Sequence, residues 1–290
     1  MSAHRIRHVD AFTSAPLTGN PAAVVDGAGI DPALMQRIAQ NQNLSETVFL
    51  LPPDDGANDA SIRIFTPRSE LPFAGHPIVA AAHILTEERI ATPAAGEPLR
   101  LETGAGVIPV SVEGTPAVYT MTQARPEFRE SSVTPETIAA AIGVTPAEIA
   151  RVAEVSTGMW WTVAQVSSLD AMLRVKPDAH LLQSLHLAIF CVGAQLPGAD
   201  VHVRAFVLPQ GIAEDPVTGS ANGCIAALIA RHALIASRDG AVRYLAEQGI
   251  EIGQAGRVQL CVRGAGERLS VQVGGNAVTV LRGELLLDDA

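Results

Sequence analysis

The chain of 290 residues is long enough for one large or two medium domains, and an apolar content of 48% is sufficient for a buried core. A net charge of −10 without a cluster of basic residues argues against nucleic acid or an anionic membrane as the main binding partner. The only lysine, Lys176, lies in a polar run typical of a solvated turn, so we do not expect catalysis through a lysine imine.

The first fifty residues predict strands around one helix. Residues 5–12 and 22–25 have strand patterns, and Asp31-Pro32 predicts the start of a helix, because an N-cap acid followed by proline is a common helix start. A further strand over 43–51 has Glu46 near its beginning. Glu46 is either a solvated carboxylate at a strand end or a partly desolvated acid suited to proton transfer near neutral pH.

The segment from Ile62 to Leu85 is the most informative stretch. It predicts a short apolar strand, a turn rich in proline and glycine, and a helix that is apolar on nearly every face. Because a helix without a polar face must be buried, its start points into the protein. Gly75 leaves backbone N–H groups accessible there, and His76 can exchange a proton. The histidine is therefore either a helix-capping residue or part of an active site.

The same construction recurs between Val201 and Ile235. A strand, a Pro/Gly turn and a second nearly all-apolar helix follow one another. Arg204-Ala205-Phe206 precedes the second helix as Arg63-Ile64-Phe65 precedes the first. This recurrence predicts a twofold internal repeat, in which two similar lobes are each built around a buried helix.

Short strands are predicted over much of the remaining chain. Their patterns cover residues 99–103, 107–112, 118–122, 152–156, 161–166, 258–262 and 269–273. Gly274-Gly275 predicts a hairpin turn that leads from the last of these strands into another over 278–281. In the pair Trp160-Trp161 the side chains should point to opposite faces of a strand, so one belongs to the core and the other lines a pocket or interface.

The three cysteines, Cys191, Cys224 and Cys261, are far apart, odd in number and set among apolar residues. This pattern predicts free thiols in a reducing compartment. Because no secretory signal and no long apolar run is present, we expect a cytoplasmic protein that does not span a membrane.

A second acidic motif precedes the second apolar helix. Glu214-Asp215-Pro216 supplies two carboxylates where capping of the helix needs one, so Asp215 is either a capping acid or a functional one. Gly219 and Ser220 follow, and their N–H groups and hydroxyl are suited to bind a substrate carboxylate.

Neither a nucleotide cofactor nor a metal ion is expected. The chain has no third glycine after Gly104-Ala105-Gly106 and no phosphate-loop lysine. His76 and His83 are about 10 Å apart along a helix axis at 1.5 Å per residue, so they cannot share one ion. His83 is expected to be a hydrogen-bonded core residue.

Several motifs, in order along the chain, resemble those of the PhzF-like phenazine biosynthesis isomerase family. They are Thr18-Gly19-Asn20-Pro21, Ser45-Glu46-Thr47, Phe65-Thr66-Pro67, Glu70 to Pro77 and Glu214 to Ala221. The resemblance covers nearly the whole chain. It implies an α+β, diaminopimelate epimerase-like fold with two pseudo-symmetric lobes, each a sheet wrapped around a central buried helix. On this basis residues 1–118 and 278–290 form the N-terminal lobe, residues 119–277 form the C-terminal lobe, and the active site lies in the cleft between them.

The resemblance also implies roles for particular residues. Glu46 is the acid/base that takes a proton from one substrate carbon and returns it to another, and His76 and Asp215 assist or orient. The expected substrate-binding residues are Asn20, Gly75, Gly219 and Ser220. The family's named reaction is an allylic proton shift in trans-2,3-dihydro-3-hydroxyanthranilate without a cofactor. The expected partner is therefore a small carboxylate substrate, and a homodimer is the expected assembly.

Two alternatives stay open. Related epimerases and racemases place a cysteine at the start of each central helix, where this chain has Ala74 and Thr218. A two-thiol mechanism is therefore disfavoured, but an epimerase or racemase of an amino acid or imino acid that uses another acid/base pair is not. The second alternative is a non-catalytic binding protein of the same fold. Ile78, where many relatives have threonine, leaves the substrate undetermined.

Overall fold

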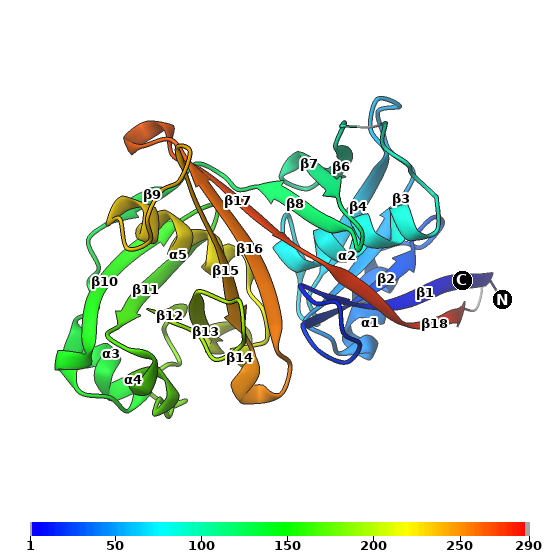
Figure 1. Ribbon diagram of the computed structural model, residues 1–290. Coiled ribbons are helices and arrows are strands. Elements are labelled where there is room, and N and C mark those ends of the chain that lie inside the picture. The colour runs from blue at the N-terminus through cyan, green and yellow to red at the C-terminus, as the bar shows by residue number, and fades with distance from the viewer. Residues whose placement is uncertain (1, 95, 288–290) are drawn as a thin grey trace. The chain divides into compact units, whose positions relative to one another are not determined.

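The computed structural model describes residues 2–94 and 96–287, and the chain forms two compact units (Figure 1). Unit 1 comprises the residues up to Met121 and those from Gly274 onward, and unit 2 comprises Thr122–Val273. Both limits fall inside strands, β8 (Val118–Thr122) and β17 (Ser270–Gly275), by which the chain passes from one unit to the other. They therefore lie a few residues away from the expected limits at 118/119 and 277/278.

Unit 1 contains a mixed sheet. Its elements are β1 (Ser2–Ala11), β2 (Asn20–Asp26), α1 (Pro32–Gln42), β3 (Glu46–Leu51), β4 (Ala60–Phe65), β5 (Glu70–Leu71), α2 (Gly75–Glu87), β6 (Leu99–Thr103), β7 (Gly106–Glu113) and β8. β1 is antiparallel to β2, β2 is parallel to β3, and β3 is antiparallel to β4. β4 is then antiparallel to β5 and parallel to β6, and β6 is antiparallel to β7.

Unit 2 repeats this order. Its elements are β9 (Glu127–Arg129), α3 (Pro135–Ile142), β10 (Ile149–Ser156), β11 (Trp160–Val166), α4 (Leu169–Leu173), β12 (Leu187–Val192), β13 (Val201–Val207), β14 (Ile212–Asp215), α5 (Gly219–Arg231), β15 (Ala241–Gln248) and β16 (Gly256–Arg263). From β10 to β16 the pairings have the same sequence of antiparallel and parallel contacts as those from β1 to β7. The predicted twofold repeat is therefore present strand by strand.

The strand that follows each repeat belongs to the other unit. β9, which follows β8, is antiparallel to β10, and β18 (Ala277–Leu287) is antiparallel to β1 from Ser2 to Ala11. Thus β9 follows the first repeat but completes the sheet of unit 2, and β18 follows the second repeat but completes the sheet of unit 1.

The hairpin predicted at Gly274-Gly275 is wrong. Both glycines lie within β17, and β18 pairs with β1 rather than folding back. A Cβ on Gly274 would lie 2.4 Å from Thr120 Oγ1, closer than any carbon can approach. The glycine therefore allows β8 to pack closely against β17.

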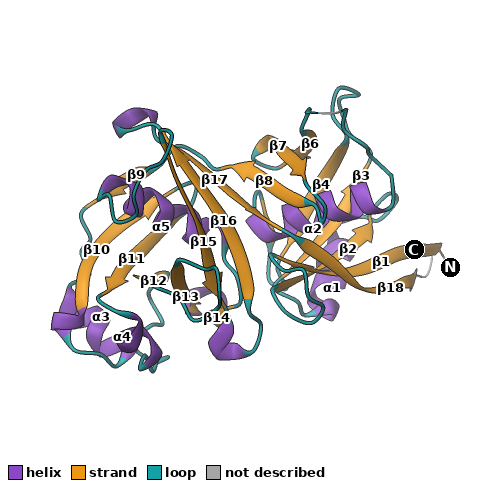
Figure 2. Cartoon of the chain, viewed as in Figure 1, coloured by secondary structure: helices purple, strands orange, loops and turns teal. Residues whose placement is uncertain are grey.

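A nearly apolar helix occupies the middle of each unit, and the strands curve around it (Figure 2). Most residues of α2 and of α5 are buried, as the absence of a polar face predicts. In unit 1 the amphipathic helix α1 covers another face of the sheet, where Met35 and Ile38 pack with Val25 and Phe49. Within the described residues, no helix has the length and apolar character needed to cross a membrane.

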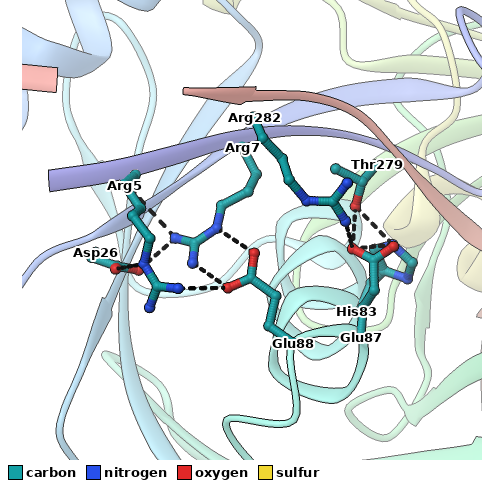
Figure 3. A network of polar contacts seen from close by, with 8 residues as sticks. All are labelled: Arg5, Arg7, Asp26, His83, Glu87, Glu88, Thr279 and Arg282. Carbon is teal, nitrogen blue, oxygen red and sulfur yellow. Dashed lines mark hydrogen bonds and ion pairs between the residues drawn. The ribbon is translucent and has the colours of Figure 1, made fainter. Parts of the chain in front are cut away.

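Charged side chains fix the last turn of α2 (Figure 3). Glu87 and Glu88 place carboxylates at a helix C-terminus, where the helix dipole is unfavourable to them. Arg7, which is only 1% exposed, donates to both Glu88 and Asp26, while Arg282 on β18 donates to Glu87 at 2.6 Å. These pairs hold α2 against β1, β2 and β18 and so fix the position of its opposite end.

Candidate functional site

Two of the predicted catalytic residues lie together in unit 1. Glu46 is the first residue of β3, and His76 lies in the first turn of α2. Glu46 Oε2 is 3.0 Å from His76 Nε2, and the two side chains are 13% and 7% exposed. Glu46 Oε2 accepts no hydrogen bond from the described residues, so the imidazole nitrogen lies near it without a hydrogen bond between these two atoms. A carboxyl and an imidazole that are this close and largely shielded from solvent are suited to acid/base chemistry.

Asn20 lies at the same edge of the sheet. β2 and β3 are parallel with Ala22 opposite Glu46, so Asn20 lies two residues before the position that faces Glu46. Asn20 is fully buried as the first residue of β2. Gly19 before it has φ +72°, and a Cβ there would lie 2.3 Å from Ala11 O, so only glycine can make the turn that places Asn20.

The two central helices differ from the others in their capping. α1, α3 and α4 have N-cap side chains, from Asp31, Thr134 and Ser168, that accept hydrogen bonds from the first turn. The N-caps of α2 and α5, Ala74 and Thr218, make no such side-chain bond, and neither first turn contains an acid. The N–H groups that begin at Gly75 and Gly219 are therefore not neutralised by a capping side chain, which suits them to an anionic ligand.

In unit 2 the two acids of the Glu214-Asp215 motif have different partners. Glu214 accepts two hydrogen bonds from Arg204, at 2.9 and 2.8 Å, so this carboxylate is held in a buried ion pair. Asp215 is buried at the end of β14, and its Oδ2 accepts a hydrogen bond from the Thr218 hydroxyl. Asp215, rather than Glu214, is thus the acid beside the start of α5.

Ser220 has a partner that sequence reasoning did not assign to it. Trp161 Nε1 donates to Ser220 Oγ at 3.2 Å. Because an indole N–H can only donate, Ser220 Oγ is the acceptor, and its own hydrogen remains available to donate elsewhere. Trp161 is fully buried, as expected for one member of the tryptophan pair, while Trp160 lies under the guanidinium of Arg129 at 4.0 Å.

Other polar residues that the sequence singled out, such as His83, have structural contacts. His83 contacts Tyr119 Oη and Thr279 Oγ1 at 3.2 and 3.1 Å, which confirms it as a hydrogen-bonded core residue. Burial raises the pKa of the Cys224 thiol to about 12, so this thiol does not replace a catalytic cysteine. Among the residues the structure describes, no three histidine, cysteine or acidic side chains are grouped to hold a metal ion.

Comparison with known proteins gives one family. The family described as phenazine biosynthesis-like protein matches residues 9–283. A trans-2,3-dihydro-3-hydroxyanthranilate isomerase of Pseudomonas fluorescens is 37% identical over 294 residues, covering 98% of this chain and all of that protein.

Solved structures agree with this result. A PhzF-family phenazine biosynthesis protein of Bacillus anthracis superposes with a TM-score of 0.90 at 30% identity, covering 99% of this chain and 100% of the other. A hydroxyproline epimerase of Agrobacterium vitis has a TM-score of 0.66 at 15% identity over 99% of this chain and 93% of the other. The second similarity is one of fold alone, and together the two confirm the diaminopimelate epimerase-like fold.

Proposed function

The chain belongs to the phenazine biosynthesis-like family and is an isomerase, and we propose that it moves a proton between two carbons of a small carboxylate without a cofactor. The observation that carries the proposal is the contact between Glu46 and His76. A single carboxyl can serve as base and then as acid if it reaches both carbons. With 13% of its side chain exposed, Glu46 is shielded enough to limit loss of the proton to water.

The proposed roles of the other residues follow from their surroundings. The uncapped N–H groups at Gly75 and Gly219 and the hydroxyl of Ser220 support binding of a substrate carboxylate. Asn20 is proposed as a further polar contact, and His76 and Asp215 as groups that orient the reacting atoms.

Trans-2,3-dihydro-3-hydroxyanthranilate is the substrate we propose to test first. It is the compound named for the Pseudomonas fluorescens relative. An epimerase with two catalytic thiols receives no support, because Ala74 and Thr218 begin the central helices.

The test is proton NMR of this substrate in deuterium oxide with the wild type, Glu46→Gln and Glu113→Gln. Glu113 is exposed on β7, so its variant controls for loss of a negative charge away from the site. Conversion by the wild type and by Glu113→Gln, with a loss of at least about 100-fold in Glu46→Gln, is expected. Retention of part of the substrate's own hydrogen in the product would support transfer by one shielded carboxyl. Normal turnover by Glu46→Gln would reject the mechanism.

We also propose a homodimer in the cytoplasm. Twofold dimers are the commonest oligomers, and all three cysteines are free, which is typical of a reducing compartment. Light scattering coupled to gel filtration tests the dimer, and a monomeric mass at micromolar concentration would reject it.

A further inference from the structure

We propose that Gln248 is the positioning residue that orients Asp215 and the first turn of α5, an inference that rests on the function proposed above. Gln248 is the last residue of β15 and is fully buried. It lies 33 residues along the chain from Asp215.

The side-chain amide of Gln248 uses its full hydrogen-bonding capacity on this one segment. Its Oε1 accepts from the backbone N–H of Thr218 at 3.1 Å and from Asn222 Nδ2 at 2.8 Å. Its Nε2 donates to the carbonyl of Asp215 at 2.9 Å and to Thr218 Oγ1 at 3.0 Å. An amide has two donor hydrogens and two acceptor positions, so no capacity is left over.

Two partners of the Gln248 amide can act only as a donor or only as an acceptor, and they fix the direction of these hydrogen bonds. The Thr218 N–H can only donate, and the Asp215 carbonyl can only accept, so the amide of Gln248 cannot be turned over. Thr218 Oγ1 therefore accepts from Gln248 and gives its own hydrogen to Asp215 Oδ2. A chain of hydrogen bonds with one polarity runs from Gln248 through Thr218 to the Asp215 carboxylate.

This arrangement explains why Thr218 does not cap α5 with its side chain. Its hydroxyl is directed to Asp215, and Gln248 supplies the acceptor for the Thr218 N–H from another element. The next residue packs tightly against the same segment. Gly249 has φ +85°, and a Cβ there would lie 2.6 Å from the carbonyl of Pro216, so this position requires glycine. Gln248 and Gly249 thus hold both the acid and the start of the helix that the proposed function assigns to the substrate.

The first arm of the test measures turnover in Gln248→Met, which keeps the length of the side chain and removes its polar atoms. We expect kcat to fall about 100-fold because the acid is misplaced rather than absent, and KM to rise because the first turn of α5 loses its hydrogen bonds to Gln248. Gln259→Met is the matched control, since Gln259 is exposed on the neighbouring strand β16, and its kcat should equal that of the wild type.

Thr218 variants separate positioning from general loss of structure. Thr218→Ser keeps the hydroxyl and should keep most of the activity, whereas Thr218→Val should lose about as much as Gln248→Met. The double variant Gln248→Met/Thr218→Val should be no slower than Gln248→Met alone, because both changes interrupt one chain. Additive losses in the double variant, or full activity of Thr218→Val, would overturn the proposal. The Thr218 pair decides the matter even if Gln248→Met does not fold.

The second arm does not depend on turnover. Hydrogen exchange at the Thr218 amide, followed by NMR, should be faster in Gln248→Met than in the wild type and unchanged in Gln259→Met. An unchanged Thr218 amide in folded Gln248→Met would overturn the inference whatever the enzyme's substrate is. A wild type that fails to convert the dihydro-hydroxyanthranilate would instead remove the proposed substrate, and the exchange result would still decide the role of Gln248.

Discussion

Two buried tyrosines differ in what their hydroxyl groups contact. Tyr119 Oη contacts His83 Nδ1 at 3.2 Å and Thr86 Oγ1 at 2.9 Å. The hydroxyl of Tyr244 is buried and has no hydrogen-bond partner among the described residues, and burial raises its pKa well above the ordinary value. A buried polar group without a partner opposes folding, whereas a bonded one supports it.

The two Tyr→Phe substitutions should therefore have opposite effects. Tyr244→Phe should leave the free energy of unfolding unchanged or raise it by up to about 1 kcal/mol, because only an unbonded hydroxyl is removed. Tyr119→Phe should lower it by about 1 kcal/mol or more, because His83 and Thr86 each lose a partner. Urea unfolding of the two variants is the measurement. Equal destabilisation by both would contradict the difference in their surroundings.

Sequence reasoning identified residues whose chemistry is unusual for their context, and it missed residues whose role depends on a distant partner. Glu46 and His76 were marked because a strand and a buried helix each begin with a titratable group, although their 3.0 Å separation was not predictable. Gln248 has no titratable group and received no role, since a polar residue at a strand end is normally solvated. The hydrogen bond from Trp161 to Ser220 joins residues 59 apart in the sequence, and the Trp160-Trp161 pair was the only local feature that pointed to Trp161.

At the scale of elements, the internal repeat places one ion pair in each unit. Arg63 on β4 is paired with Glu70 on β5 and lies 5.3 Å from the ring of Phe65. In unit 2, Arg204 on β13 is paired with Glu214 on β14 and lies 5.3 Å from the ring of Phe206. The contacts correspond, but their burial does not. The Arg63 and Glu70 side chains are 30% and 42% exposed, against 6% and 8% for Arg204 and Glu214.

Burial decides how much stability the protein loses when the acid of each pair is replaced. Glu214→Gln should destabilise the protein by about 3 kcal/mol, because it leaves the Arg204 guanidinium buried without a countercharge. Glu70→Gln should change stability by less than about 1 kcal/mol, because Arg63 remains in contact with water. Chemical denaturation of both variants tests this, and similar losses in the two would show that burial is not the deciding difference.

A histidine in unit 2 joins three elements. His202 on β13 lies with Nδ1 2.7 Å from Glu247 Oε1 on β15 and Nε2 3.0 Å from Glu251 Oε1 in the short 3-10 helix Ile250–Ile252. Both ring nitrogens face carboxylates, an arrangement that suits the protonated ring. Burial alone lowers the pKa of His202, but the hydrogen bonds and charges of Glu251 and Glu247 raise it overall.

The contribution of His202 to the stability of the protein should therefore fall as the pH rises above 6.5. A raised histidine pKa contributes stability fully below the ordinary value of 6.5, and this contribution is lost as the pH passes the folded-state pKa. The pKa of Glu251 is lowered by its bond to His202 despite burial, so its contribution is lost only toward acid pH. His202→Gln should flatten the slope of the urea midpoint against pH above 6.5.

His83→Gln is the control for that slope. Burial lowers the pKa of His83, so its ionisation affects stability as the pH falls and not as it rises. A slope above pH 6.5 that persists in His202→Gln would assign the loss of stability to another group.

Most elements were predictable because their cause is local. The buried central helices followed from apolar residues on every face, and α1 followed from its Asp31-Pro32 start. The predicted hairpin failed because Gly274 is required by the approach of Thr120, a tertiary contact that has no local signal. The pairing of β18 with β1 links the two ends of the described chain and is equally invisible in a local pattern.

For the whole molecule, the repeat has a consequence for connectivity. Unit 2 is one continuous segment, whereas unit 1 is made of two segments that meet where β18 pairs with β1. Ser2 lies opposite Leu287 in that ladder, so the two ends of the described chain are neighbours within unit 1. A short Gly/Ser linker can join neighbouring ends without strain, which makes circular permutation a direct test of this arrangement.

A permutant that joins residue 287 to residue 2 and opens the chain between Gly56 and Ala57 should fold with a urea midpoint close to that of the wild type. Both residues at the new ends are exposed, and a Cβ at Gly56 would have nothing within 4 Å. Opening the chain between Gly275 and Asn276 should destabilise it strongly, because Gly275 is buried and the Asn276 carbonyl accepts from Thr13 N–H at 3.2 Å. Failure of the first permutant to fold, with a linker long enough to span neighbouring strands, would contradict the pairing of β18 with β1 that completes unit 1.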